Sequence, residues 1–288
     1  MSATGPYYAI YLMIISALSF TFMDSIVKYL ESVSPYQMVF FRALGSLVLC
    51  MGYLWIKGIP MFGNNKTWLI LRGVVGTISM TLFFMAIKLI PIGSAVTLRY
   101  LSPIFAAVLA LLFLGERIKK MQWIFFLLAF FGAALLKGFD FRISTLGFVL
   151  ILGSALFSGM VYAIIKKIGG SEHPLVIVGY FMMVATVAGL LMSLPDWESP
   201  PRDLWLPLAS LGVFGFFGQL FMTLALQKDD LVRVIPFKYA EAVLVVFVGF
   251  IWFGEGFGFI ALFGILMIIV GMVSNVIYSN KERLANIK

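Results

Sequence analysis

The sequence predicts an all-α integral membrane protein of about ten transmembrane helices, and three observations carry this prediction. Hydrophobic residues make up 62% of the 288 positions and charged residues only 12%, whereas soluble domains usually carry about 25% charged residues. Apolar runs long enough to cross a bilayer recur along the whole chain. The two halves of the chain also repeat each other at a nearly constant offset. Lipid is therefore the expected main solvent.

The expected spans are apolar runs bounded by charged residues, glycine or proline. They fall at 8–27, 36–56, 68–89, 92–114, 121–137, 146–166, 174–194, 204–227, 233–253 and 257–278. Pro91 and Gly93 divide the region 68–114 into two helices, because both residues interrupt a regular helix. The first run has no basic segment before it, so we interpret it as a retained helix and not as a cleaved signal.

Lysine and arginine are distributed unevenly between the two sides of these spans. With a cytoplasmic N-terminus, the inner side holds thirteen: Lys57, Lys66, Arg72, Arg117, Lys119, Lys120, Lys166, Lys167, Lys228, Arg233, Lys281, Arg283 and Lys288. The outer side holds five: Lys28, Lys88, Lys137, Arg142 and Arg202. This positive-inside bias predicts that both termini are cytoplasmic. Compact loops and short termini favour a bacterial inner membrane.

The repeat is visible at a shift of 139 positions, with the first helices aligning at 138. The aligned pairs include Pro35 with Pro174, Gly73 with Gly212, Gly76 with Gly215, Arg99 with Lys238, Tyr100 with Tyr239, and Gly115-Glu116 with Gly254-Glu255. We expect two units, 1–140 and 141–280, and a short cytoplasmic tail, 281–288. Each unit has five helices, so the second enters the membrane from the opposite side. Such inverted repeats can expose a site near the midplane alternately to either face.

Several short motifs resemble the drug/metabolite transporter superfamily, in its EamA-type branch. They are Asp24-x-x-x-Lys28-Tyr29-Leu30, Pro35, Phe40-Phe41-Arg42, Ser102-Pro103, Leu114-Gly115-Glu116-Arg117, Tyr239-Ala240-Glu241 and Phe253-Gly254-Glu255. The resemblance covers almost the whole chain. It implies a fold of two inverted five-helix repeats around a central cavity, and secondary transport that is often export.

Five ionisable residues lie inside the expected spans: Asp24, Arg42, Arg99, Lys238 and Glu241. Each costs about 2.5–3.5 kcal/mol near the centre of a helix, so such residues usually face a cavity, a pathway or a partner. Between Asp24 and Arg42 we favour a structural ion pair that holds the first repeat together or acts as a gate.

Arg99 is the main candidate for binding an anionic group of a substrate, through its planar set of donors. The alternatives are an ion pair with Asp24 and hydrogen bonds to backbone carbonyls. Lys238 is its repeat equivalent, so the two cations would bracket a cavity; alternatively, Lys238 neutralises Glu241, three residues away, or reaches the membrane interface. Glu241 is also a candidate protonation site, which leaves proton coupling as an open alternative.

Tyr100 and Tyr239 each follow one of these cations, so we expect them to line the cavity. Gln219 is a further candidate, with simple packing as the alternative. One histidine and one cysteine provide no ligand cluster for a metal, and no cofactor is expected. No phosphate-binding loop and no paired catalytic groups are present, so neither a primary pump nor an enzyme is expected.

The expected function is secondary transport of a small polar metabolite, an organic anion or a carboxyl-bearing zwitterion. Amino acids, amines and S-adenosylmethionine-like metabolites are alternatives, and a channel or a lipid-handling protein is the alternative of another class. The expected partners are the substrate and the lipid bilayer, with the protein as a monomer or homodimer. The net charge of +8 is assigned to loops that face anionic headgroups, not to nucleic acid.

Overall fold

The computed structural model describes residues 8–102, 104–106, 108–109, 119–228, 237–238 and 240–285. Within these residues the chain forms ten α-helices and three short 3₁₀ helices, and no strand occurs there. The α-helices are α1 (Tyr8–Tyr29), α2 (Pro35–Ile56), α3 (Lys66–Leu89), α4 (Ile92–Arg99), α6 (Lys120–Phe139), α7 (Thr145–Ile168), α8 (Pro174–Ser193), α9 (Trp205–Lys228), α11 (Ala240–Phe253) and α12 (Phe259–Ala285). Pro103, the motif at 114–117, Tyr239 and the last three residues of the tail lie outside the described part.

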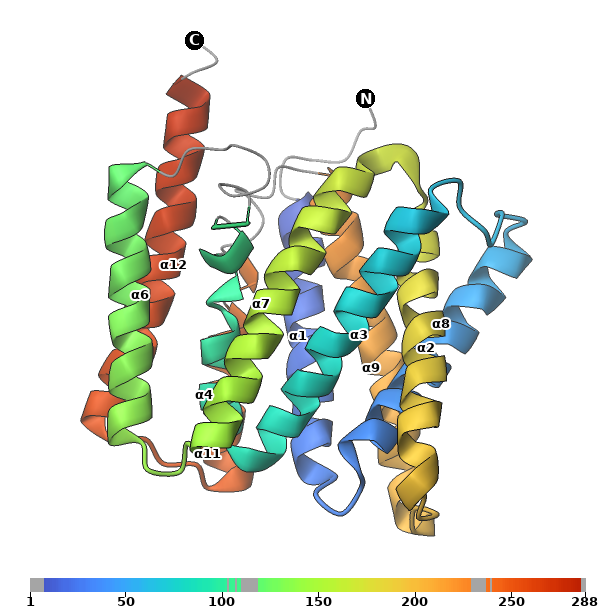
Figure 1. The fold of residues 1–288 in the computed structure, drawn as a ribbon, viewed down its shortest axis with the longest axis horizontal. Helices are drawn as coiled ribbons and strands as arrows, with labels where there is room; N and C mark the ends of the chain where they lie inside the picture. Colours follow the sequence, from blue (N-terminus) through green and yellow to red (C-terminus); the bar gives the residue numbers. More distant parts are fainter. Residues whose placement is uncertain are drawn as a thin grey trace.

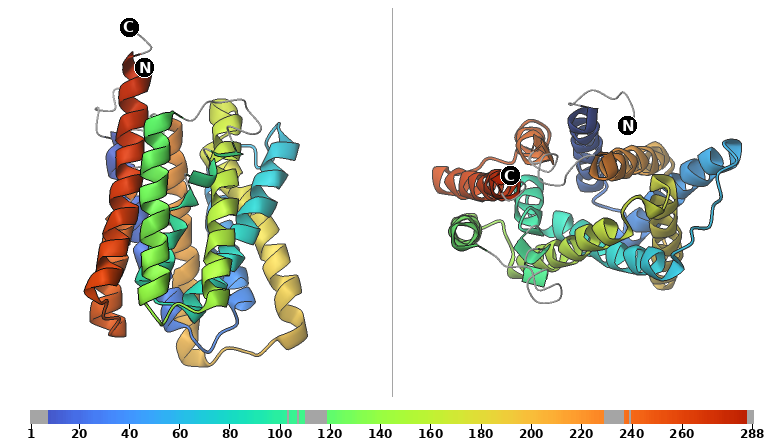
Figure 2. Two further views of the ribbon diagram at one scale, coloured as in Figure 1. Left: turned by 60° about the vertical axis from the view of Figure 1, so that its left-hand side comes forward. Right: turned by 90° about the horizontal axis from the view of Figure 1, so that it is seen from above.

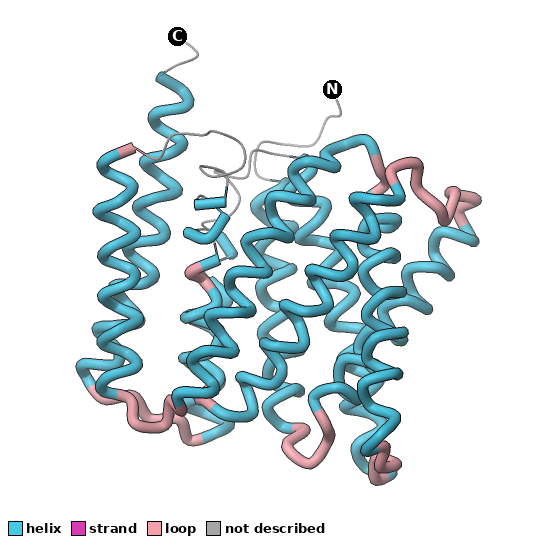
Figure 3. The backbone as a smooth tube through the Cα atoms, in the orientation of Figure 1, coloured by secondary structure: helices cyan, strands magenta, loops and turns pink. Residues whose placement is uncertain are grey.

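Seven of the described helical stretches are long and apolar enough to cross a membrane. They are Tyr8–Tyr29, Pro35–Ile56, Lys66–Leu89, Thr145–Ile165, Pro174–Asp196, Arg202–Lys228 and Phe259–Tyr278. Lys120–Leu136 and Ala240–Phe253 are shorter apolar helices. Connecting loops gather at the two ends of the bundle (Figure 3). Helices suit this environment because lipid offers no partner to an unpaired backbone group.

Local sequence explains where several of these helices begin. Pro35 and Pro174 stand at the first positions of α2 and α8, where a residue without a backbone N–H is tolerated. Pro91 precedes α4 in an extended conformation, as the division of 68–114 into two helices requires. The helices thus begin close to the starts of the expected spans.

The fourth span differs from the expected continuous helix over 92–114. The helix α4 ends at Arg99, and Tyr100 and Leu101 form a turn before helical residues resume at Ser102. Their backbone N–H groups bond three residues back, to Thr97 and Leu98, as in a tightened helix end. Discontinuous helices of this kind occur at the binding sites of secondary transporters.

The start of α4 is capped by a carboxylate from the other half of the chain. One oxygen of Glu255 accepts a hydrogen bond from the Ile92 N–H at 2.9 Å and the other from the Gly93 N–H at 3.4 Å. Gly254 adopts φ +62°, a conformation that glycine tolerates, and so lets the chain turn after α11. Lys28 lies 3.8 Å from the same carboxylate. A negative group here complements the positive end of the helix dipole.

The two halves form inverted repeats, α1 to α6 and α7 to α12. In Figure 1, α1 begins at the top of the bundle and α7 at the bottom, so corresponding helices run in opposite directions. The contacts between helices follow the same repeat symmetry: a pair of helices in contact has a corresponding pair when each helix is replaced by its repeat equivalent. Contacts of α1 with α9 are matched by α7 with α3, and those of α2 with α9 by α8 with α3. The pairs α2–α8 and α6–α12 join equivalent helices, and α4–α11 joins different parts of the two equivalent interrupted spans.

The last helix of each repeat lies away from the centre. The helices α6 and α12 run side by side along one edge of the bundle (Figures 1 and 2). The other described helices enclose the interior, where α2 and α9 approach closely at two glycines. A Cβ added to Gly45 would lie 2.9 Å from the Gly212 Cα, so neither position has room for a larger residue.

Candidate functional site

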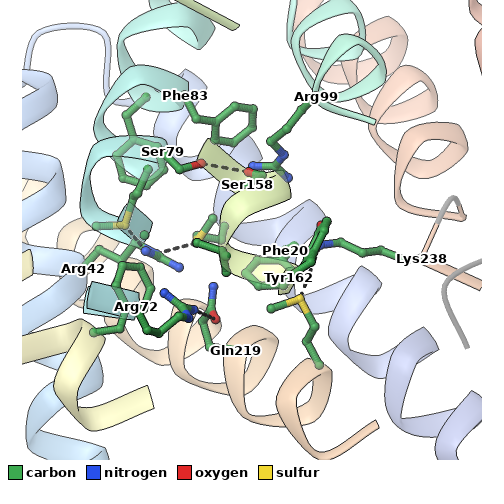
Figure 4. A pocket seen from close by; sticks show the side chains of 17 residues that line it. Phe20, Arg42, Arg72, Ser79, Phe83, Arg99, Ser158, Tyr162, Gln219 and Lys238 are labelled. Carbon is green, nitrogen blue, oxygen red and sulfur yellow. Dashed lines mark hydrogen bonds between the residues drawn. The ribbon is translucent and has the colours of Figure 1, made fainter. Parts of the chain in front are cut away.

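A cavity of about 80 Å³ lies between the two repeats, which is room for several water molecules. Its wall includes four cations: Arg42 from α2, Arg72 from α3, Arg99 at the end of α4, and Lys238 just before α11. It also includes five aromatic rings: Phe20, Phe83, Phe84, Tyr162 and Phe181. Both repeats therefore contribute to one cationic and aromatic cavity (Figure 4).

Arg99 holds two carboxylates at the edge of this cavity. Its Nη2 lies 2.8 Å from Glu241 Oε1 and 3.5 Å from Asp24 Oδ2. Both acids are 0% exposed, and the guanidinium stacks over Phe83, 3.6 Å from the ring centroid. A buried carboxylate is normally paired, because its desolvation is costly. The contact between Arg99 and Asp24, given above as an alternative, is therefore the one that forms.

The expected ion pair between Asp24 and Arg42 does not form, although the structure describes both side chains. Arg42 instead donates from Nε to the Met23 sulfur at 2.9 Å and from Nη1 to the Met80 sulfur. The physical reason is that Arg99 already compensates Asp24 together with Glu241. Arg42 is thereby left inside the bundle, 2% exposed, and among the described residues it has only weak sulfur acceptors.

Lys238 and Glu241 do not pair with each other either. The Lys238 ammonium donates to the Tyr162 hydroxyl at 3.1 Å and contacts the Met222 sulfur at 3.4 Å. Tyr100 is buried outside the cavity wall, where its hydroxyl donates to the backbone carbonyl of Lys238 at 2.8 Å. Tyr239 lies outside the described residues. The structure thus places Arg99, Lys238 and Gln219 on the cavity wall, with Glu241 behind Arg99.

Arg72 is a cavity cation that sequence reasoning missed, because it was counted with the cytoplasmic cations. Tyr162, the partner of Lys238, was not named either. Arg72 is 1% exposed and its guanidinium lies 4.3 Å from the Phe181 ring centroid. Nη2 donates to Gln219 Oε1 at 3.3 Å, while Nε and Nη1 have no partner in the described part of the chain. Its position inside the expected span 68–89 is the signal that identifies it.

The repeat relates the two ends of the cavity. The shift of 139 carries Arg99 onto Lys238, and the shift of 138 carries Asp24 onto Tyr162. Each cation therefore contacts a side-chain oxygen from the first helix of its own repeat. In the first repeat this oxygen belongs to a carboxylate and in the second to a neutral phenol. The geometry is shared and the charge is not.

The cavity has an excess of positive charge. Among the described residues, Arg42, Arg72 and Lys238 have no carboxylate within 4 Å, and both nearby acids are held by Arg99. Four cations and two carboxylates leave two net positive charges when all are ionised. An electropositive, partly aromatic cavity can bind an anionic organic group.

The apolar helices and the polar cavity between inverted repeats define a polytopic membrane protein of the transporter class. A sequence profile of the EamA-like transporter family matches residues 4–137 and again 145–277. The chain therefore belongs to the EamA-like transporter family, as its motifs predicted.

Similar proteins include transporters of different named metabolites. The chain is 28% identical to the pseudopaline exporter CntI of Pseudomonas aeruginosa, over 91% of this chain and 94% of that protein. It is 27% identical to a riboflavin transporter of Vibrio cholerae, over 84% of each. It is 26% identical to an S-adenosylmethionine uptake transporter of Rickettsia felis, over 94% and 93%. These relatives are transporters and not enzymes.

A solved crystal structure of another protein has the same fold. It superposes with a TM-score of 0.69 over 93% of this chain and 94% of that chain, at 16% sequence identity. The likeness supports the fold, and the family match makes the protein an integral membrane transporter of small molecules.

Proposed function

We propose that this protein is a secondary transporter that carries a small polar metabolite with at least one acidic group by alternating access. The charge balance of the cavity carries the proposal for the substrate. Arg42, Arg72 and Lys238 have no carboxylate partner among the described residues. An anion or a carboxyl-bearing zwitterion would supply the missing counter-charge, whereas an amine would meet repulsion.

The repeat architecture supports alternating access. Both repeats line the cavity, and the main helix contacts are preserved when corresponding helices are exchanged. Two arrangements of similar energy, each open to a different side, follow naturally from such pseudo-symmetry. The interruption of the fourth span next to Arg99 provides a place where the backbone can bend.

Specific roles follow from the positions of the side chains. Arg72 and Lys238 would bind acidic groups directly, and the Gln219 amide would orient the Arg72 guanidinium through its carbonyl oxygen. Arg99 would contribute one face of the wall while it holds Asp24 and Glu241.

The test begins with purified protein and a thermal-stability screen over carboxylates, zwitterionic amino acids and amines of similar size. Compounds that raise the thermal midpoint then enter counterflow assays in proteoliposomes. We expect saturable counterflow for an acid-bearing compound and none for its amide. Conduction without counterflow would favour the channel alternative, and stabilisation by amines alone would contradict the proposed substrate class.

We further propose a bacterial inner membrane with both termini in the cytoplasm. The only cysteine, Cys50, is buried, so a Cys50→Ala background allows single cysteines to be introduced. Glu31→Cys, in the loop after α1, should react with an impermeant thiol reagent added outside intact cells. Asn64→Cys, in the loop before α3, should react only after the membrane is opened. Reversed labelling would contradict the orientation.

Proton coupling through Glu241 stays a prediction. One oxygen of this buried carboxylate, Oε2, has no hydrogen-bond partner among the described residues. An imposed pH gradient should change the rate of transport in the wild type and not in Glu241→Gln. Equal rates with and without the gradient would argue against coupling.

A further inference from the structure

Arg42 and Arg72 form one cationic wall of the cavity. Both guanidiniums lie over the Phe181 ring, with their Cζ atoms 5.8 Å and 4.3 Å from its centroid. Figure 4 shows them on the same side of the cavity. An aromatic face attracts a cation, but it does not cancel two like charges that are held close together. This wall therefore lacks an anion.

Two repeat-equivalent glycines make room for these arginines. A Cβ added to Gly76 would collide with the Arg72 Nη1, and one added to Gly215 would lie 2.9 Å from the Arg42 Nε. The shift of 139 positions carries Gly76 onto Gly215. Each repeat thus leaves out a side chain at the same position, and an arginine fills the space. A glycine in each repeat therefore provides the space that the two arginines occupy.

The two arginines are also short of acceptors. Each carries five N–H donors. In the described structure Arg42 bonds only to the sulfurs of Met23 and Met80, and two of the three Arg72 nitrogens have no partner. Burial of a guanidinium with so few acceptors is unfavourable unless something else supplies them. A bound oxyanion would supply strong acceptors to both side chains.

Lys238 provides a second positive position, separate from this wall. In Figure 4 it enters from the opposite side, beside Phe20 and Tyr162. Its ammonium lies 5.4 Å from the centroid of each of these rings, and its partners Tyr162 and Met222 are uncharged. Two positive positions are therefore separated by a partly aromatic space.

We propose that the cavity selects substrates with two acidic groups, one bound at the Arg42–Arg72 wall and the other at Lys238. Two acidic groups match the two net positive charges of the cavity. This inference rests on the proposed function and sharpens it, because it names the charge and the two attachment points of the substrate. The apolar part of such a molecule would lie against the rings between the two positions.

The experiment measures binding to the purified full-length protein at constant ionic strength. The probes are linear dicarboxylates from malonate to adipate, each compared with the monocarboxylate of equal chain length and with the half-amide. At the best chain length we expect the dicarboxylate to bind about tenfold or more tightly than either control, since each charged hydrogen bond adds affinity. No preference for the dicarboxylate at any length would overturn the inference.

Variants assign the two positions. Arg72→Gln should weaken the dicarboxylate about tenfold or more and also weaken the monocarboxylate, because the main oxyanion position is lost. Lys238→Gln should remove the preference for the dicarboxylate and leave the monocarboxylate almost unchanged. Arg202→Gln, at an exposed arginine in a short 3₁₀ helix, is the matched control. Unchanged dicarboxylate binding in Arg72→Gln would contradict the assignment.

Two further comparisons separate a folding defect from a loss of binding, and failure of this inference from failure of the proposed function. If Arg72→Gln fails to fold, Gly76→Ala displaces the same guanidinium with a single methyl group, and Gly52→Ala, where an added Cβ meets nothing within 4 Å, is its control. Saturable counterflow of a monoanion or a zwitterion without a dicarboxylate preference would contradict this inference and leave the proposed function standing. Absence of counterflow for every compound would instead contradict the proposed function itself.

Discussion

Two equivalent positions of the repeats differ in the groups that face their cations. In the first repeat, Arg99 meets the carboxylate of Asp24, and Glu241 adds a second one. In the second repeat, Lys238 meets the hydroxyl of Tyr162. The backbone arrangement is shared, but the cation of the first position is paired with carboxylates and the cation of the second is not. The comparison teaches that a duplicated fold can keep the geometry of a contact in both copies and change its charge in one of them.

The largest expected effect is at Arg99, the cation that is paired with carboxylates. Arg99→Met leaves Asp24 and Glu241 buried without a cation, and breaking such a group costs about 3–5 kcal/mol. We expect a large fall in the free energy of unfolding, measured by thermal or denaturant unfolding in detergent. Adding Asp24→Asn and Glu241→Gln to the same chain should recover at least half of the loss. A triple variant no more stable than Arg99→Met would contradict this interpretation.

A transplanted carboxylate tests whether the difference between the repeats controls binding. Tyr162→Glu places an acid beside Lys238 and makes the second repeat resemble the first. The dicarboxylate should then bind about tenfold more weakly, a loss of about 1.4 kcal/mol, because Lys238 is already compensated. Tyr162→Gln is the uncharged control. Equal losses in both variants would show that the ring matters and the charge does not.

Removal of the Lys238 ammonium should have little effect on the stability of the protein. Lys238→Met loses a hydrogen bond to a neutral phenol and also removes an unbalanced buried charge. We expect the free energy of unfolding to stay within about 1 kcal/mol of the wild type. A loss as large as that of Arg99→Met would mean that both positions are structural, and the contrast between the repeats would disappear.

The smallest expected effect concerns the cap of α4. Glu255→Gln removes the negative charge at the helix start and the contact with Lys28, and should cost about 0.5–1 kcal/mol. Glu198→Gln, in an exposed loop, serves as control. The repeat equivalent is Glu116, so Glu116→Gln should cost a similar amount. A clear difference in stability between the two variants would show that the repeats also differ at these two loop glutamates.

Hydropathy was enough to predict the helices, because the bilayer imposes the length and character of each span, and the repeat with its odd number of helices predicted the inverted arrangement. The expected span 36–56 and the observed Pro35–Ile56 differ by one residue. Interruption of the fourth span after Arg99 was not predictable in this way. It depends on contacts of Tyr100 with a segment more than a hundred residues away, and hydropathy contains no such information.

The candidate site was predicted only in part. Arg99, Lys238 and Gln219 were named and do line the cavity. The pair of Arg99 with Asp24 was only an alternative, since Asp24 lies at a depth comparable to that of two arginines and sequence spacing does not choose between them. Tyr162, the partner of Lys238, was not named. Arg72 was assigned to the membrane surface by a charge count that ignores depth. Rotation of each helix about its axis decides such contacts, and it is set by packing against helices from the other repeat.

The carboxylate of Glu255 belongs to the second half of the chain but fixes the beginning of a helix in the first half. If the two halves of the sequence moved apart as separate units, this contact would break. Under the proposed alternating access, a body that moves as a unit would therefore contain helices of both repeats. We would assign each moving unit from the contacts between helices. On this basis α4 and the end of α11 belong to the same unit.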